Sequence, residues 1–143
     1  MPEERTTRYR HEAALTRPVT AYLRSCGYNR VAREVPFYDH SIDLYALNES
    51  GDWSIAVELK LDRWRRALAQ ALLYQLCADV VTVALPMKHA DRVDLSTYAV
   101  HGVGLVAVKN DGRCEERLTP RPAGVMRQDY KTECKALMRG KSR

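Results

Sequence analysis

Asp43, Glu58 and Lys60 form a set of side chains that can do phosphate chemistry if the fold brings them together. Glu58 and Lys60 alternate with apolar residues in the segment 53–60, so on a β-strand they point to one face together with Ala56. Asp43 lies in the preceding apolar segment, across a single short turn, so the two carboxylates can face each other on paired strands. Two buried carboxylates and an ammonium are costly unless they are paired or bind a metal.

The chemistry expected of this trio is hydrolysis of a phosphodiester bond. Two carboxylates supply the hard oxygen ligands that Mg²⁺ prefers, and Mn²⁺ is expected to substitute for it. Such an ion polarises a phosphoryl oxygen and lowers the pKa of a bound water. Lys60 can orient that water or stabilise the developing negative charge. The alternative is a salt bridge between Lys60 and Asp43 or Glu58 on a half-exposed sheet, where such pairs are common.

Three strands are predicted around the trio. They cover residues 30–36, 40–48 and 53–60, and the polar residues 48–52 form the turn between the second strand and the third. Short connections of this kind imply an antiparallel meander, which is the arrangement that would bring Asp43 across from Glu58.

A helix is predicted before the meander. Thr16 can cap its start, Pro18 falls near its first turn, where proline is tolerated, and Gly27 ends it. Residues 5–15 are a candidate for an earlier helical stretch. We expect that stretch to end at a kink, because the residue before a proline disfavours helical backbone.

The second half of the chain alternates helices and strands. Asp62 can cap a helix over residues 63–78, which is rich in alanine and leucine. The later elements are predicted at residues 80–85 (strand), 90–99 (helix), 103–108 and 113–118 (strands) and 124–139 (helix). The order is αβββαβ followed by an αββ extension. It predicts an α/β fold with a mixed central sheet flanked by helices.

This arrangement resembles the PD-(D/E)XK nucleases, which have the restriction-endonuclease-like fold. The resemblance rests on Asp43, on the sequence Glu58-Leu59-Lys60 and on the αβββαβ order, and it covers more than half of the chain. Ile42 stands where the family has a proline before the acid, a position that varies widely in the superfamily. The resemblance implies that Asp43, Glu58 and the Leu59 carbonyl bind a metal. Lys60 would then act on the attacking water.

The helix after the trio carries a second match. Gln70 and Tyr74 fit the QxxxY pattern of RecB-like nucleases, and at i and i+4 they share one helical face with Arg66. The resemblance implies that this face looks toward the active site and the DNA backbone. Gln70 would join the catalytic set, and Tyr74 and Arg66 would contact DNA. The alternative is a glutamine and a tyrosine at the core edge of an amphipathic helix, since this spacing is frequent by chance.

Glu12 is the candidate for a further acidic residue at the metal site, because an early helix supplies one in many relatives. A solvated helix acid is the alternative, and the kink expected near Pro18 leaves the direction of Glu12 open. His11 is a weaker candidate, since a lone surface histidine usually has no such role.

Three arginines follow the strand that ends at Lys60. Arg63, Arg65 and Arg66, together with Trp64, would place cations and an aromatic ring at the mouth of the site. Arginine suits bidentate contact with phosphate, and the start of a helix favours anions further. The alternative is a helix start whose long side chains extend into solvent.

The net charge of +5 is concentrated in residues 121–143, which carry seven basic and two acidic residues. The chain is therefore predicted to comprise a nuclease-like domain over residues 1–120 and a basic C-terminal tail or helix over residues 121–143. DNA is a natural partner for such a segment, and a solvated tail that aids solubility is the alternative.

Other sites and locations have less support in the sequence. The four cysteines lack zinc-ligand spacing and are expected to be reduced thiols. A GxxxxGK[ST] loop is absent, so no nucleotide cofactor is expected, and no nucleophile elbow surrounds Ser41. No apolar run approaches the roughly 18 residues of a membrane span. No secretory signal is evident either, so a cytoplasmic location is expected.

The sequence thus predicts a Mg²⁺-dependent deoxyribonuclease, with endonuclease action favoured. A domain of this size offers little surface for recognising a DNA duplex. Sequence-specific cutting would therefore need a homodimer or another partner. Two alternatives stay open. One is a non-catalytic nucleic-acid-binding or scaffold protein on the same fold. The other is RNA as the substrate, although the sequence lacks an aromatic RNA-stacking signature.

Overall fold

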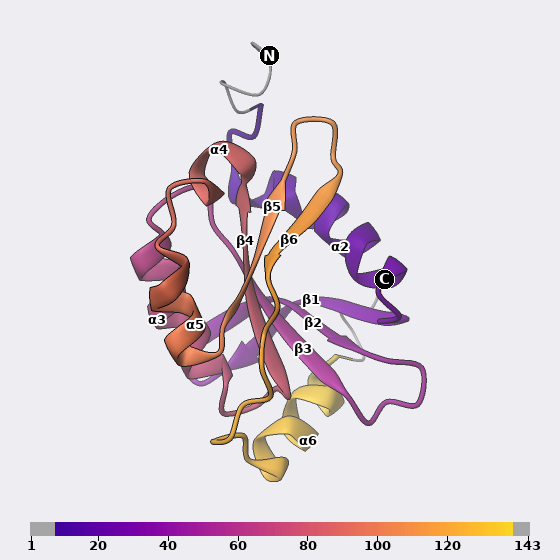
Figure 1. Cartoon of the computed structure of the whole chain (residues 1–143). Helices are drawn as coiled ribbons and strands as arrows, with labels where there is room; N and C mark the ends of the chain where they lie inside the picture. The colour runs from indigo at the N-terminus through magenta and orange to yellow at the C-terminus, as the bar shows by residue number, and fades with distance from the viewer. Residues whose placement is uncertain (1–7, 139–143) are drawn as a thin grey trace.

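A six-stranded mixed sheet forms the centre of the computed structural model, which describes residues 8–138 (Figure 1). The strands lie side by side in chain order. They are β1 (Arg30–Phe37), β2 (His40–Leu47), β3 (Ser54–Leu59), β4 (Val80–Pro86), β5 (Gly104–Val108) and β6 (Cys114–Leu118). All six predicted strands are confirmed, with ends that differ by at most one residue.

The direction of the strands follows from their connections. β1, β2 and β3 pair antiparallel through short turns, β4 is parallel to β3, β5 is parallel to β4, and β6 returns antiparallel. Each parallel pair, β3–β4 and β4–β5, needs a crossover connection between its strands. Right-handed crossovers that move across the sheet in the same direction place their helices on the same face of the sheet. α3 (Trp64–Tyr74) and α5 (Leu95–His101) occupy that face, and α2 (Thr16–Ser25) lies on the other (Figure 1).

Two apolar cores result, one on each face of the sheet. Alternation along β3 sends Ala56 toward α3, whereas Val57 and Leu59 pack with Leu23 of α2. Each helix buries a single face against the sheet. None of the helices within residues 8–138 combines the length and apolar character that a bilayer span requires.

The kink expected before Pro18 is absent. A 3₁₀ turn, η1 (Glu12–Leu15), runs directly into α2, and Leu15 itself has helical backbone. Pro18 occupies the third position of α2, within the first turn, where its missing N–H costs no hydrogen bond. Thr16 is the first helical residue rather than a side-chain cap. Of the stretch predicted at 5–15, residues 5–7 lie outside the described part of the chain.

The starts of two helices also differ from prediction. Asp62 does not cap α3, because Arg63 takes the N-cap position in a left-handed conformation (φ 56°) without a capping side chain. The helix predicted at 90–99 is two helices, α4 (Met87–Ala90) and α5. Asp94 separates them and caps α5, since its carboxylate accepts a hydrogen bond of 3.2 Å from the Ser96 N–H.

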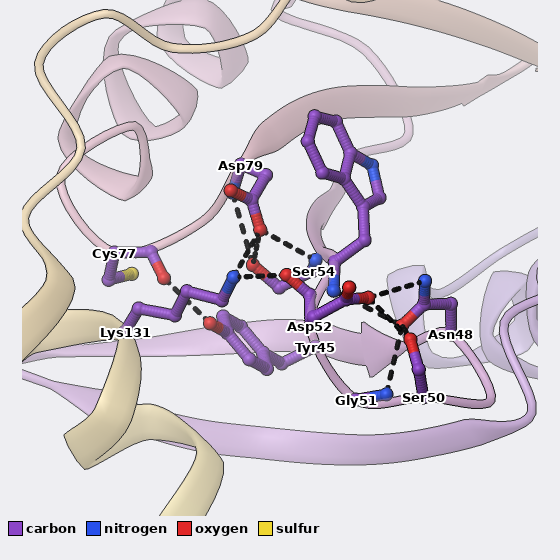
Figure 2. A network of polar contacts seen from close by, with 10 residues as sticks. Tyr45, Asn48, Ser50, Gly51, Asp52, Ser54, Cys77, Asp79 and Lys131 are labelled. Carbon is purple, nitrogen blue, oxygen red and sulfur yellow. Dashed lines mark hydrogen bonds and ion pairs between the residues drawn. The ribbon is translucent and has the colours of Figure 1, made fainter.

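α6 (Gln128–Leu137) packs against the same core as the sheet, with Cys134 and Met138 buried. Lys131 anchors it, because its ammonium lies 2.7 Å from an Asp79 oxygen and donates to the Asp52 carbonyl at 2.6 Å (Figure 2). The described part of the basic segment therefore belongs to the folded domain. Arg139, Lys141 and Arg143 lie outside the described residues.

Candidate active site

Asp43 and Glu58 lie where β2 and β3 separate. The last paired residues are Leu44 and Val57, so each carboxylate comes one residue beyond the end of the ladder. A side chain closes this gap, because the Leu59 N–H donates a 2.8 Å hydrogen bond to Asp43 Oδ2. The meander thus brings the two acids together, as the sequence predicted, although at a fork rather than within paired strands.

Glu58 is buried and Asp43 is half-buried, and their carboxyl groups are close enough to share a hydrogen bond. Only 6% of Glu58 is exposed, and burial, followed by the charge of Asp43, raises its pKa to about 8. Burial also raises the pKa of Asp43, against the lowering effect of the hydrogen bond from Leu59. Lys60 favours the charged form of both acids but does not offset their burial.

Lys60 follows β3 directly and is held to the neighbouring strand. Its backbone N–H donates to the Ala84 carbonyl at 3.1 Å, which fixes the direction of the side chain. Its ammonium lies 4.0 Å from Glu58 Oε2 and 3.8 Å from Glu12 Oε2. These distances agree with the prediction that Glu58 and Lys60 point to one side, and they place Lys60 between two acids.

Glu12 reaches this place from the η1 turn. Its side chain is 49% exposed, and its negative charge contributes to raising the pKa of both Asp43 and Glu58. Within residues 8–138, no group of three His, Cys, Asp or Glu side chains could hold a metal ion. The two carboxylates that lie close together are Asp43 and Glu58, and their metal binding, like a role for Glu12 through a bridging water, stays a prediction.

The donor set suits a hard divalent cation. Burial, followed by the charge of Asp43, raises the pKa of Glu58, and a cation between the two carboxylates would oppose this rise. Mg²⁺ commonly takes one or two carboxylates and completes its shell with water and substrate phosphate. Asp43 and Glu58 match that requirement. A metal contact from the Leu59 carbonyl stays a prediction.

A cleft of about 280 Å³ opens beside Asp43 and includes Ser41 and Leu59 in its wall. Sequence reasoning missed two residues of this wall, Arg33 and Glu34 of β1. Glu34 lies opposite Asp43 in the register but has left-handed backbone (φ 54°) and interrupts the pairing of β1 with β2. Nothing in the alternating sequence of β1 signals this local distortion.

Tyr74 and Gln70 both lie on α3 but differ in their surroundings. Tyr74 is only 1% exposed, and its hydroxyl donates to the Ser41 carbonyl at 3.3 Å. Burial raises its pKa, and the nearby charge of Glu58 adds to the effect. The DNA contact predicted for Tyr74 does not fit this burial, and the residue instead supports β2 beside the site. Gln70 Oε1 is buried and has no hydrogen-bond partner among the described residues.

Arg63, Arg65 and Arg66 gather as predicted, but around a separate cavity of about 410 Å³. His89 and Arg92 complete the basic part of its wall, and the Arg65 guanidinium stacks 4.2 Å from the centre of a Trp64 ring. This cavity shares no lining residue with the cleft at Asp43. The arginines therefore adjoin the candidate site along the chain without lining it.

Two solved structures resemble this one. A protein of unknown function from Silicibacter pomeroyi aligns with a TM-score of 0.67 at 19% identity, covering 88% of this chain and 82% of its own. A repair endonuclease from Pyrococcus abyssi aligns with a TM-score of 0.50 at 16% identity, covering 73% of this chain and 50% of its own, so the chain spans half of that enzyme. No protein-family profile and no curated protein matches the chain. At these identities the likeness shows the fold, a mixed α/β sheet flanked by helices of the restriction-endonuclease-like kind.

Proposed function

We propose that the protein is a metal-dependent nuclease of the PD-(D/E)XK type that hydrolyses phosphodiester bonds in DNA. The observation that carries the proposal is the close pair of Asp43, which is half-buried, and Glu58, which is buried, with the Lys60 ammonium 4.0 Å from Glu58. A salt bridge alone does not account for this group, because one lysine lies near three acids and two of them adjoin each other away from solvent.

Asp43 and Glu58 would hold Mg²⁺, which supplies a polarised phosphoryl oxygen and a more acidic water when it is bound. Lys60, whose ammonium lies 4.0 Å from Glu58 Oε2, would hold the attacking water by a hydrogen bond and offset negative charge at the reacting phosphate. The hydrogen bond from the Leu59 N–H keeps the Asp43 carboxylate in one orientation. Gln70, Arg63, Arg65 and Arg66 are proposed to hold the phosphate backbone around this centre.

The structural neighbours support only the general class of the proposed activity, that of a nuclease. The Pyrococcus abyssi protein is a repair endonuclease, and its fold is shared over most of this chain. The same fold can carry a protein that binds nucleic acid without cutting it. The proposal therefore depends on the chemistry of the Asp43–Glu58–Lys60 group more than on the likeness.

Cleavage assays on purified protein test the proposal. Supercoiled, linear duplex and single-stranded DNA are each incubated with Mg²⁺ or Mn²⁺, beside Asp43→Asn and Lys60→Met variants. Arg113→Ala is the matched control, since Arg113 pairs with Asp111 at the surface. We expect cleavage by the wild type and the control, and a loss of at least about 100-fold in the two variants. Equal cleavage by all four proteins, or none on any DNA, contradicts the proposal. DNA binding without cleavage would instead identify a non-catalytic binding protein.

A further inference from the structure

A groove leads away from the candidate site along α2. The cleft at Asp43 adjoins a larger cavity of about 620 Å³, and the two share Ala13, Thr16 and Arg33 in their walls. The shared residues make the two cavities one continuous depression. It runs on the α2 face of the sheet, opposite the face that carries α3.

One stripe of α2 and the turn before it forms the long wall of the groove. The lining residues fall at positions 13, 16, 17, 20, 21 and 24, which recur every three or four residues and so share one helical face. From the first to the last, this stripe is about 16 Å long at 1.5 Å per residue. Alanine and threonine between the arginines keep the wall low, so an extended chain can lie against the helix.

The larger cavity of the groove is basic, whereas the cleft at its end is lined by Glu12, Glu34 and Asp43. Arg17 and Arg24 project from α2, and Arg33 of β1 joins them. Neither Arg17 nor Arg33 makes an ion pair with any residue in the range 8–138. The hydroxyls of Thr16 and Thr20 can donate to phosphate oxygens. Cations and hydroxyls in the larger cavity, next to a cleft lined by Asp43, fit a polyanion whose reacting phosphate lies at the Asp43 end.

We propose that this groove binds the phosphate backbone of one strand of single-stranded DNA and leads it to Asp43. The cavity volumes suit a short stretch of one strand, whereas a duplex is far wider than the groove. No aromatic side chain of residues 8–138 lines either cavity, so bases are not expected to stack there. The proposed contacts are to phosphates, which carry no sequence information, so binding should be independent of sequence. The delivery of the strand to Asp43 rests on the proposed nuclease function, while binding in the groove does not.

Fluorescence anisotropy with labelled oligonucleotides tests the groove without any cleavage. The protein is titrated in EDTA with single-stranded oligomers of two unrelated sequences and with a duplex of one of them. Variants Arg17→Ala and Arg33→Ala are compared with Arg30→Ala, an exposed arginine of the same strand that is absent from both walls. Circular dichroism establishes that each variant is folded.

Both groove variants are expected to weaken single-strand binding about tenfold and equally for the two sequences. Each should also lower the slope of log K against log salt by about 0.7, the value for one phosphate contact on a single strand. Arg30→Ala should change neither quantity. Unchanged binding in the groove variants, or tighter binding of the duplex, overturns the inference. Single-strand binding that depends on Arg17 and Arg33, in a protein that cuts no DNA with any metal, supports the groove while the nuclease proposal fails.

Discussion

The Leu59 N–H donates a 2.8 Å hydrogen bond to Asp43 Oδ2, across the point where the backbone ladder between β2 and β3 has ended. A side chain thus takes the place of the missing ladder bond. This fixes the Asp43 carboxylate at the fork, with Glu58 beside it and the cleft in front. The separation of β2 from β3 beyond Leu44 and Val57 therefore leaves room for the Asp43 and Glu58 side chains and for the cleft beside them.

Glu58 is expected to make the stability of the protein depend on pH and, if the proposed metal binds, on that metal. Its pKa is about 8 in the folded protein against an ordinary value of 4.5, so the folded state binds more protons than the unfolded state between these values. The free energy of unfolding should consequently fall as pH rises from about 4.5 to about 8. Asp43, whose pKa is also raised by burial, adds to the fall.

Urea unfolding at several pH values, with and without Mg²⁺, measures this dependence. Glu58→Gln should be more stable than the wild type near pH 8 and should show a flatter profile. Mg²⁺ should stabilise the wild type more at pH 8 than at pH 6, because the metal displaces a proton. Identical profiles for wild type and variant would show that Glu58 titrates normally.

Gln70 has a buried Oε1 without a hydrogen-bond partner among residues 8–138, an unfavourable arrangement that a function at the site would explain. Gln70→Met keeps the size of the side chain and removes the unpaired oxygen. We expect stability to be unchanged or higher and cleavage to fall about tenfold or more.

Gln75, the C-cap residue of the same helix, provides the control. Its Nε2 donates to the His101 carbonyl at 2.8 Å, so Gln75→Met should lower stability slightly and leave cleavage unchanged. Stability is read from thermal unfolding and activity from the rate of DNA cleavage. Full activity in Gln70→Met would mean that the QxxxY match has no functional meaning in this protein.

Lys131 holds α6 to the sheet. Its ammonium is nearly buried, and it pairs with Asp79, which also accepts hydrogen bonds from the Ser54 N–H and hydroxyl (Figure 2). Lys131→Met should cost about 3–5 kcal/mol, because it leaves the Asp79 charge buried without its counterion. Lys135→Met, one turn later, should cost much less. Equal urea midpoints for the two variants would argue against this anchoring role.

The sequence predicted the helices and strands that depend on local residue patterns. It predicted less well the places where tertiary contacts determine the backbone conformation. Alternation along residues 53–60 placed Glu58 and Lys60 correctly, and Gly27 follows the end of α2 with a positive φ of 100°. The helix start at Arg63 does not use the nearby Asp62, because the chain turns there through a left-handed residue that no local signal marks.

Charge distribution along the chain was a poorer guide to charge distribution in space. The basic segment 121–143 was predicted to be a tail or helix apart from residues 1–120, yet Arg121 donates to the Ala99 carbonyl and Lys131 is buried. The groove arginines belong to two elements, and Arg33 of β1 joins Arg17 and Arg24 of α2 only through the packing of α2 on β1. Composition alone gives no indication of such a groove.

Mn²⁺ binding tests most directly whether Asp43 and Glu58 share one ion. Titration followed by electron paramagnetic resonance of free Mn²⁺ gives the number of sites and their affinity, and it needs no knowledge of the substrate. We expect one site in the wild type and in Glu34→Gln, an exposed acid in the wall of the same cleft. That site should be lost in both Asp43→Asn and Glu58→Gln. Mn²⁺ binding of equal strength in all four proteins would contradict the account.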